Sequence, residues 1–314
     1  RARAGDPLPA ARCPVNAALR APFPWFGGKS RAADLVWRAL GDVANYVEPF
    51  AGSLAVLLAR PHTPRVETVN DLDCYLANFW RAVSHDPDAV ARFADWPVNE
   101  ADLHARHKWL LGRRESLAGM LDADPDAFDA KVAGWWVWGL SCWFGSGWCT
   151  GRASRQIPHL SRPGHGAHAV NASVAADYRN LRSRLRRVRV ACGDWRRIVA
   201  ESVTRSPGTP CGVFLDPPYA EGNQQYAAGG TGTGLSADVR AWAIDNGDHR
   251  WLRIVLAGYE GEHAMPRGWR SIEWKALGGY GNAAGNENAA RERLWLSPHC
   301  LGSDASLPLF GGAR

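Results

Sequence analysis

No apolar run in the 314-residue sequence approaches the roughly 18 residues that a membrane-spanning helix needs. The opening segment, RARAGDPLPAARCPVNAALRAPFP, also lacks the continuous apolar stretch of a secretory signal peptide. With 46% hydrophobic and 22% charged residues, the chain has the composition of a globular protein with a sizeable core. We therefore expect a cytoplasmic protein without a membrane partner, in which residues 1–23 form a flexible lead-in.

Cysteine pairs and lysines are scarce. The seven cysteines are scattered and include no CxxC pair, so we expect reduced thiols and no structural zinc site. Only four of the 37 basic residues are lysines. The net charge of +6 and the pI near 9.1 favour a polyanionic partner. An arginine-rich composition also arises in GC-rich genomes, so charge alone does not identify that partner.

Short apolar runs with the character of strands alternate with segments of helical periodicity. This rhythm predicts an α/β fold with a mostly parallel sheet covered on both faces. The last two strands are joined by a Gly/Asn-rich loop, which indicates an antiparallel edge. The expected strands are 45–50, 65–71, 187–195, 212–216, 252–260, 270–277 and 291–297, and the expected helices include 53–60, 72–86 and 235–247, the last beginning near a cap at Ser236.

Residues 86–175 interrupt the rhythm and predict an inserted subdomain, helical at first and then rich in aromatic residues. We interpret Trp135, Trp136 and Trp138 as part of its core. The following Gly/Ser/Pro-rich loop carries arginines that suit phosphate or guanine contacts, namely Arg152, Arg155 and Arg162. The loop also carries His159, His165 and His168, which we expect to be solvent-exposed rather than metal ligands.

The stretch VFLDPPYA joins a buried-type strand, Val213–Leu215, to an acid, two prolines and a tyrosine. Ligands bind beyond the carboxyl ends of strands in open α/β sheets, and consecutive prolines make a stiff turn there. Asp216 and the carbonyl of Pro217 could each accept an N–H of an exocyclic base amine. That would localise the lone pair of the amine, while Tyr219 stacks on a flipped-out base. The alternative is an ordinary turn at a strand end.

Four ordered motifs carry a family resemblance: PWFGGKS at 24–30, YVEPFAG at 46–52, VNDLD at 69–73 and DPPY at 216–219. In type and order they resemble the Dam-like (D12 class, alpha group) N6-adenine-specific DNA methyltransferases. The resemblance spans residues 24 to about 300. It implies a Rossmann-like methyltransferase sheet, S-adenosylmethionine as cofactor, and a duplex DNA substrate, with or without a cognate restriction enzyme.

The resemblance also implies roles for individual residues. The DPPY residues Asp216, Pro217, Pro218 and Tyr219 would form the catalytic motif. Residues implied to bind the cofactor are Trp25, Gly28, Lys29, Glu48, Phe50, Gly52, Asp71, Asp194 and Asp216. Glu48 and Phe50 would border its methionine end, Asp71 its ribose, and Asp194 its adenine amine. No metal is implied.

Each of these roles has an alternative. Lys29 could be a surface lysine at a helix start, and Asp71 or Asp194 could cap helices. We favour the cofactor role for Asp71 and leave the two readings of Asp194 open. One departure concerns the cofactor loop: the family's second glycine, two residues after Gly52, is replaced by Leu54.

The motifs predict a methyltransferase domain of residues 24–85 and 176–300, interrupted by a target-recognition subdomain of residues 86–175. In the tail, 301–314, the segment Leu307–Phe310 weakly resembles a sliding-clamp peptide. We expect a monomer or weak dimer.

The acid of DPPY favours adenine N6 over cytosine N4. The alternatives are a cytosine-N4 DNA methyltransferase, an RNA or protein-amide methyltransferase, and a catalytically silent DNA-binding relative.

Overall fold

The computed structural model describes residues 19–23, 25, 29–143, 148–149, 157–160, 174–219, 232–274 and 291–302, without the side chains of residues 232–233. Its centre is a seven-stranded sheet in the order β3-β2-β1-β4-β5-β7-β6. The strands are β1 Asn45–Glu48, β2 Val66–Asp71, β3 Val188–Cys192, β4 Cys211–Leu215, β5 Leu252–Tyr259, β6 Arg270–Glu273 and β7 Glu292–Leu296. The first five pair in parallel, whereas β7 is antiparallel to both β5 and β6. The predicted α/β fold, a Rossmann-like methyltransferase sheet with antiparallel pairing at one end, is confirmed.

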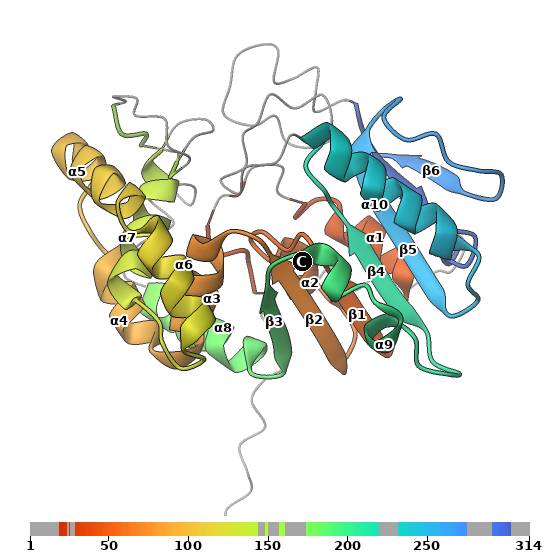
Figure 1. Ribbon diagram of the computed structural model, residues 1–314, viewed down its shortest axis with the longest axis horizontal. Helices are drawn as coiled ribbons and strands as arrows, with labels where there is room; N and C mark the ends of the chain where they lie inside the picture. The colour runs from red at the N-terminus through yellow and green to blue at the C-terminus, as the bar shows by residue number, and fades with distance from the viewer. Residues whose placement is uncertain are drawn as a thin grey trace, which may run out of the picture.

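Helices cover the two faces of this sheet (Figure 1). Six of these elements are α1 Ala33–Leu40, α2 Ala55–Leu58, α3 Cys74–His85, α9 Glu201–Thr204, α10 Gly232–Gly247 and the 3₁₀ turn η2 Trp195–Arg197. The remaining helices are α4 Pro87–Ala94, α5 Glu100–Leu111, α6 Arg114–Ala123, α7 Ala130–Cys142 and α8 Val174–Leu185. They lie beside the β3 end of the sheet (Figure 1). None of the helices described here is long and apolar enough to cross a membrane.

Alternation along β4 explains how both faces are covered. Successive strand residues point to opposite faces of a sheet. Val213 and Leu215 belong to one buried cluster, which also holds Val239 from α10. Phe214 lies in the other cluster, together with Trp37 of α1. The result is a strand buried on both sides, as expected of a central parallel strand.

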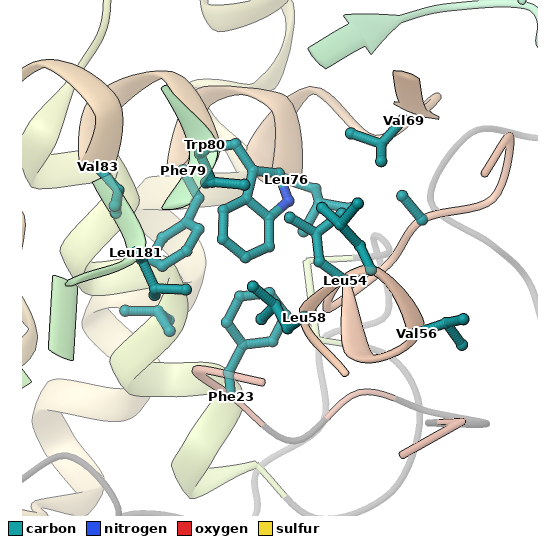
Figure 2. Packing of buried hydrophobic residues seen from close by; sticks show 14 of the residues in the cluster. Phe23, Leu54, Val56, Leu58, Val69, Leu76, Phe79, Trp80, Val83 and Leu181 are labelled. Atoms are coloured by element: carbon teal, nitrogen blue, oxygen red, sulfur yellow. The ribbon is translucent and has the colours of Figure 1, made fainter. Parts of the chain in front are cut away.

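The core on the α1 face continues without a break into the helical region. Figure 2 shows Phe79 and Trp80 of α3 in the same hydrophobic cluster as Phe23, Leu54 and Leu58. The Phe23 ring centroid is 5.2 Å from that of Phe79 and 5.7 Å from that of Trp80. Phe23 therefore anchors the start of the WFGGK segment against the hydrophobic core.

The tryptophans of α7 follow the prediction. Trp136 and Trp138 are almost completely buried, and Trp135 is partly buried against the same cluster. This helix packs against α3, α4 and α5. Gly139 on α7 leaves room for Trp148, whose indole N–H donates to the carbonyl of Trp136 at 3.0 Å.

The predicted cap at Ser236 is wrong. α10 begins at Gly232, so Ser236 lies inside the helix. The Ser236 hydroxyl donates to Oε1 of Glu262 at 2.6 Å instead of accepting from the first turn. A tertiary hydrogen bond therefore accounts for a serine that sequence alone presents as a helix cap.

Candidate active site

The ends of several strands gather the motif residues at one edge of the sheet. Parallel strands β1, β2 and β4 end there with Glu48, Asp71 and the residue before Asp216. β7 runs the opposite way, so its first residue, Glu292, reaches the same edge. This is where open α/β sheets bind ligands.

Lys29 connects the first motif to the DPPY motif. The Lys29 Nζ lies 3.1 Å from Oδ2 of Asp216, and its side chain is 4% exposed. Its backbone carbonyl accepts the amide of Ala33 at the start of α1. Lys29 is thus near a helix start, as the alternative interpretation required, but it is buried against Asp216 and is not a surface lysine.

Tyr219 lies in the same polar cluster. Its hydroxyl donates to Oε2 of Glu292 at 3.0 Å, and the Lys29 Nζ is 3.6 Å from that oxygen. The Tyr219 ring meets Tyr259 edge to face, with centroids 4.6 Å apart. Pro217 is buried and Pro218 is partly buried, consistent with a stiff turn between Asp216 and Tyr219.

Sequence reasoning missed Glu292. It is the first residue of a strand whose five residues are all buried. An acid at the start of a strand that continues into the apolar run Leu294–Leu296 was the available signal, because buried acids are usually paired. Its partners, Lys29 and Tyr219, come from distant parts of the chain.

Burial raises the pKa of the carboxyl groups at this edge. For Glu48 the pKa rises to about 8, because burial and the nearby Asp216 charge outweigh a hydrogen bond from Tyr46. For Asp71 burial raises the pKa to about 6. Burial also raises the pKa of Asp216 and of Glu292, while the Lys29 ammonium opposes both shifts. Four carboxyl groups and only one ammonium, that of Lys29, have been described at this edge of the sheet. The edge therefore favours the binding of a cationic group.

The side chain of Asp71 holds the loop that follows β1. Oδ2 of Asp71 accepts the Gly52 amide and Oδ1 accepts the Asp73 amide, both at 3.1 Å. The helix cap is Asp73, which accepts from the Tyr75 amide in the first turn of α3. The capping alternative for Asp71 is therefore wrong.

Gly52 and Leu54 form a turn with two left-handed residues. Gly52 has φ +46°, and a Cβ there would lie 2.6 Å from Cδ1 of Trp25. Leu54 also has a positive φ of 60°, and its amide donates to Ala51 at 2.8 Å. Leu54 thus adopts a left-handed conformation that favours glycine. This strain costs about 1–2 kcal/mol and is offset by complete burial of the side chain.

Asp194 caps a short turn. Its side chain accepts from the Arg196 amide at 2.8 Å and pairs with the Arg196 guanidinium at 3.2 Å. The next residue, Trp195, is buried, with its ring centroid 6.0 Å from that of Phe50. The Gly193 amide donates to the carbonyl of Asp71. The capping role of Asp194 is thus observed. Asp194 lies in the loop after β3, and this loop contacts Asp71 at the end of β2.

Contacts with α5 hold the residues that border the predicted DNA-contact loop. The His107 ring stacks on Trp148 at 4.9 Å, and its Nε2 accepts the Cys149 amide. The amide of His159, which is partly rather than fully exposed, donates to Cys142 at 2.7 Å. Several predicted residues lie outside the described residues: Gly28, Arg152, Arg155, Arg162, His165, His168 and Leu307–Phe310.

Metal-type ligands do not gather in the part of the chain described here: no group of three or more His, Cys, Asp or Glu is placed to hold an ion. The described cysteines are free thiols.

Part of the chain is similar to a known family. Residues 25–105 match the family of D12 class N6 adenine-specific DNA methyltransferases. No curated protein matches the chain. The matched segment contains Lys29, Gly52 and Asp71, whereas DPPY and Glu292 lie beyond it. Over residues 25–105 the chain is therefore similar to the D12 class N6 adenine-specific DNA methyltransferases, in agreement with the resemblance that its motifs carry.

Proposed function

We propose that the chain transfers a methyl group from S-adenosylmethionine to the N6 amine of an adenine flipped out of duplex DNA. One observation carries the proposal: buried Lys29, from the matched segment, contacts Asp216 of DPPY at the carboxyl edge of the sheet. Two motifs far apart in the chain thereby lie together at one site, which supports the proposal.

The residues fit the implied cofactor. The sulfonium and ammonium groups of S-adenosylmethionine are cationic, and Glu48, Asp71 and Asp216 supply acids at this edge. Gly52 lets the Trp25 ring pack directly against the loop after β1, where a Cβ would collide with it. We infer that Glu48 and Phe50 face the methionine end, Asp71 the ribose, and Asp194 the adenine amine.

Asp216 and the Pro217 carbonyl would each accept an N–H of the target amine, which turns its lone pair towards the methyl donor. The cofactor supplies an electrophilic methyl group. Methyl transfer would form the N–C bond as the S–C bond of the cofactor breaks, and the methylated amine would then release one proton to water. The Lys29 ammonium opposes protonation of Asp216, so the carboxylate stays available as an acceptor.

Tyr219 would stack on the flipped base, because its ring is fixed on one side by Tyr259 and at its hydroxyl by Glu292. We propose that residues 86–175 form the target-recognition subdomain and that Arg152, Arg155 and Arg162 contact DNA. Trp148 and Cys149 precede these arginines in the sequence. Hydrogen bonds to Trp136 of α7 and to His107 of α5 hold them in place.

The test is methyl transfer from labelled S-adenosylmethionine to unmethylated genomic DNA, followed by nucleoside mass spectrometry and methylation-aware sequencing. N6-methyladenine in one sequence context is the expected result. Detection of N4-methylcytosine would mean that cytosine is the target base, while the proposed chemistry of the site would stand. Absence of methylated DNA with measurable cofactor binding would favour RNA, a protein amide or a silent relative and would refute the proposal.

A further inference from the structure

Glu292 is a buried acid that belongs to none of the recognised motifs. It is 5% exposed and opens β7, where it lies opposite Tyr259 in the register with β5. The neighbouring Arg293 pairs outwards with Glu260 and Glu273 at 2.8 and 3.2 Å. The Glu292 side chain instead faces the DPPY cluster.

Two contacts define what Glu292 can do. Its Oε2 accepts the Tyr219 hydroxyl at 3.0 Å and lies 3.6 Å from the Lys29 Nζ. Lys29 is also 3.1 Å from Asp216. One carboxylate therefore reaches both functional ends of DPPY, Tyr219 directly and Asp216 through the shared ammonium.

We propose that Glu292 is a positioning residue for methyl transfer, fixing the Tyr219 ring and drawing part of the Lys29 charge away from Asp216. This inference rests on the proposed function. An ammonium paired with Asp216 alone would compete with the target amine for the carboxylate oxygens. An ammonium shared with Glu292 leaves Asp216 ionised and still able to accept from the amine.

The strand does not need this side chain in order to form. β7 is hydrogen-bonded along its backbone to β5 on one side and β6 on the other. The backbone carbonyl of Glu292 accepts the Trp274 amide independently of the carboxylate. Substitutions of Glu292 are therefore expected to leave the sheet folded and to act on the site.

The experiment compares Glu292→Gln, Glu292→Ala and Tyr219→Phe in steady-state methyl transfer to a DNA duplex. Glu273→Gln is the matched control, because Glu273 is an exposed acid on β6 that forms an ion pair with Arg293. Loss of a hydrogen bond to a charged group predicts a fall in kcat of roughly 10- to 100-fold for Glu292→Ala. The KM for DNA and the affinity for S-adenosylhomocysteine should change little.

Two further readouts separate positioning from folding. In Glu292→Gln the acid limb of the kcat profile should move to lower pH, because Asp216 loses a neighbouring negative charge and gains more of Lys29. Tyr219→Phe should cost less in the Glu292→Ala background than in the wild type, because the Tyr219–Glu292 hydrogen bond is already gone and only the interaction of the Tyr219 hydroxyl with Asp216 remains to be lost. An unchanged kcat in Glu292→Ala would overturn the proposal. So would kcat losses of the two single variants that multiply fully in the double variant, together with an unmoved acid limb in Glu292→Gln.

Failure of the proposed function is distinguishable. If the wild-type protein methylates no DNA, a crystal structure of Glu292→Gln still decides the positioning claim. The proposal requires the Lys29 Nζ to move away from residue 292 towards Asp216, while an unmoved ammonium would contradict it.

Discussion

Glu48→Gln should remove the acid limb from the pH dependence of cofactor binding. Glu48 is 2% exposed, accepts from Tyr46 at 2.9 Å, and has its pKa raised to about 8 by burial and by Asp216. If Glu48 faces the ammonium of the cofactor, as we propose, binding requires its ionised form. Ligand binding below pH 8 must then release a proton from the protein.

The size of the effect follows from the ionised fraction. With a pKa of about 8, about half of Glu48 is ionised at pH 8 and about 1% at pH 6, which weakens apparent affinity about 50-fold. Above roughly pH 8 the α-amino group of the ligand itself loses its proton. Affinity should therefore peak near pH 8 and fall on both sides.

The assay is calorimetric titration of S-adenosylhomocysteine from pH 6 to 9, in buffers of different ionisation enthalpy so that released protons are counted. Glu48→Gln should flatten the acid limb and keep the alkaline limb. Asp216→Asn should move the acid limb to lower pH, because the Asp216 charge contributes to the raised pKa of Glu48. An acid limb that is equally steep in Glu48→Gln would refute the reasoning.

Three other changes test the account. Glu48→Gln should raise the free energy of unfolding at pH 8: the raised pKa makes the wild type lose stability as pH rises from about 4.5 to about 8, visible in urea titrations at pH 5 and 8. Gly52→Ala should lower the Tm and weaken S-adenosylhomocysteine binding, because its positive φ costs about 1–2 kcal/mol and its Cβ meets Trp25; an unchanged Tm would contradict this. Asp194→Asn preserves the cap on the Arg196 amide, so calorimetry should show an unchanged Tm. Weaker binding of S-adenosylhomocysteine would then support a cofactor role for Asp194, whereas unaltered binding would leave capping as its only role.

Local patterns predicted the sheet well. The apolar run before Asp216 and the acid ending the strand at Asp71 are visible in the sequence because a buried strand leaves an uninterrupted apolar signal. Local patterns did not place Lys29 in the site. Only the family resemblance did so. A lysine at a helix start carries no local sign of burial.

Long-range contacts explain what was missed. Glu292 becomes recognisable only when β7 pairs with β5 and brings it to Lys29 and Tyr219. Ser236 presents the local chemistry of a cap but is bonded to Glu262. Leu54 takes a backbone conformation typical of glycine because its buried side chain offsets the strain. Each case is decided by tertiary packing rather than by neighbours in sequence.

The most direct test of the central claim is single-turnover methyl transfer to duplex DNA by the wild type and Asp216→Asn, with S-adenosylhomocysteine affinity measured on both. Exposed Asp245→Asn is the control. The account predicts that Asp216→Asn still binds ligand and DNA while N6-methyladenine formation falls by orders of magnitude. Wild-type transfer rates in Asp216→Asn would contradict the account.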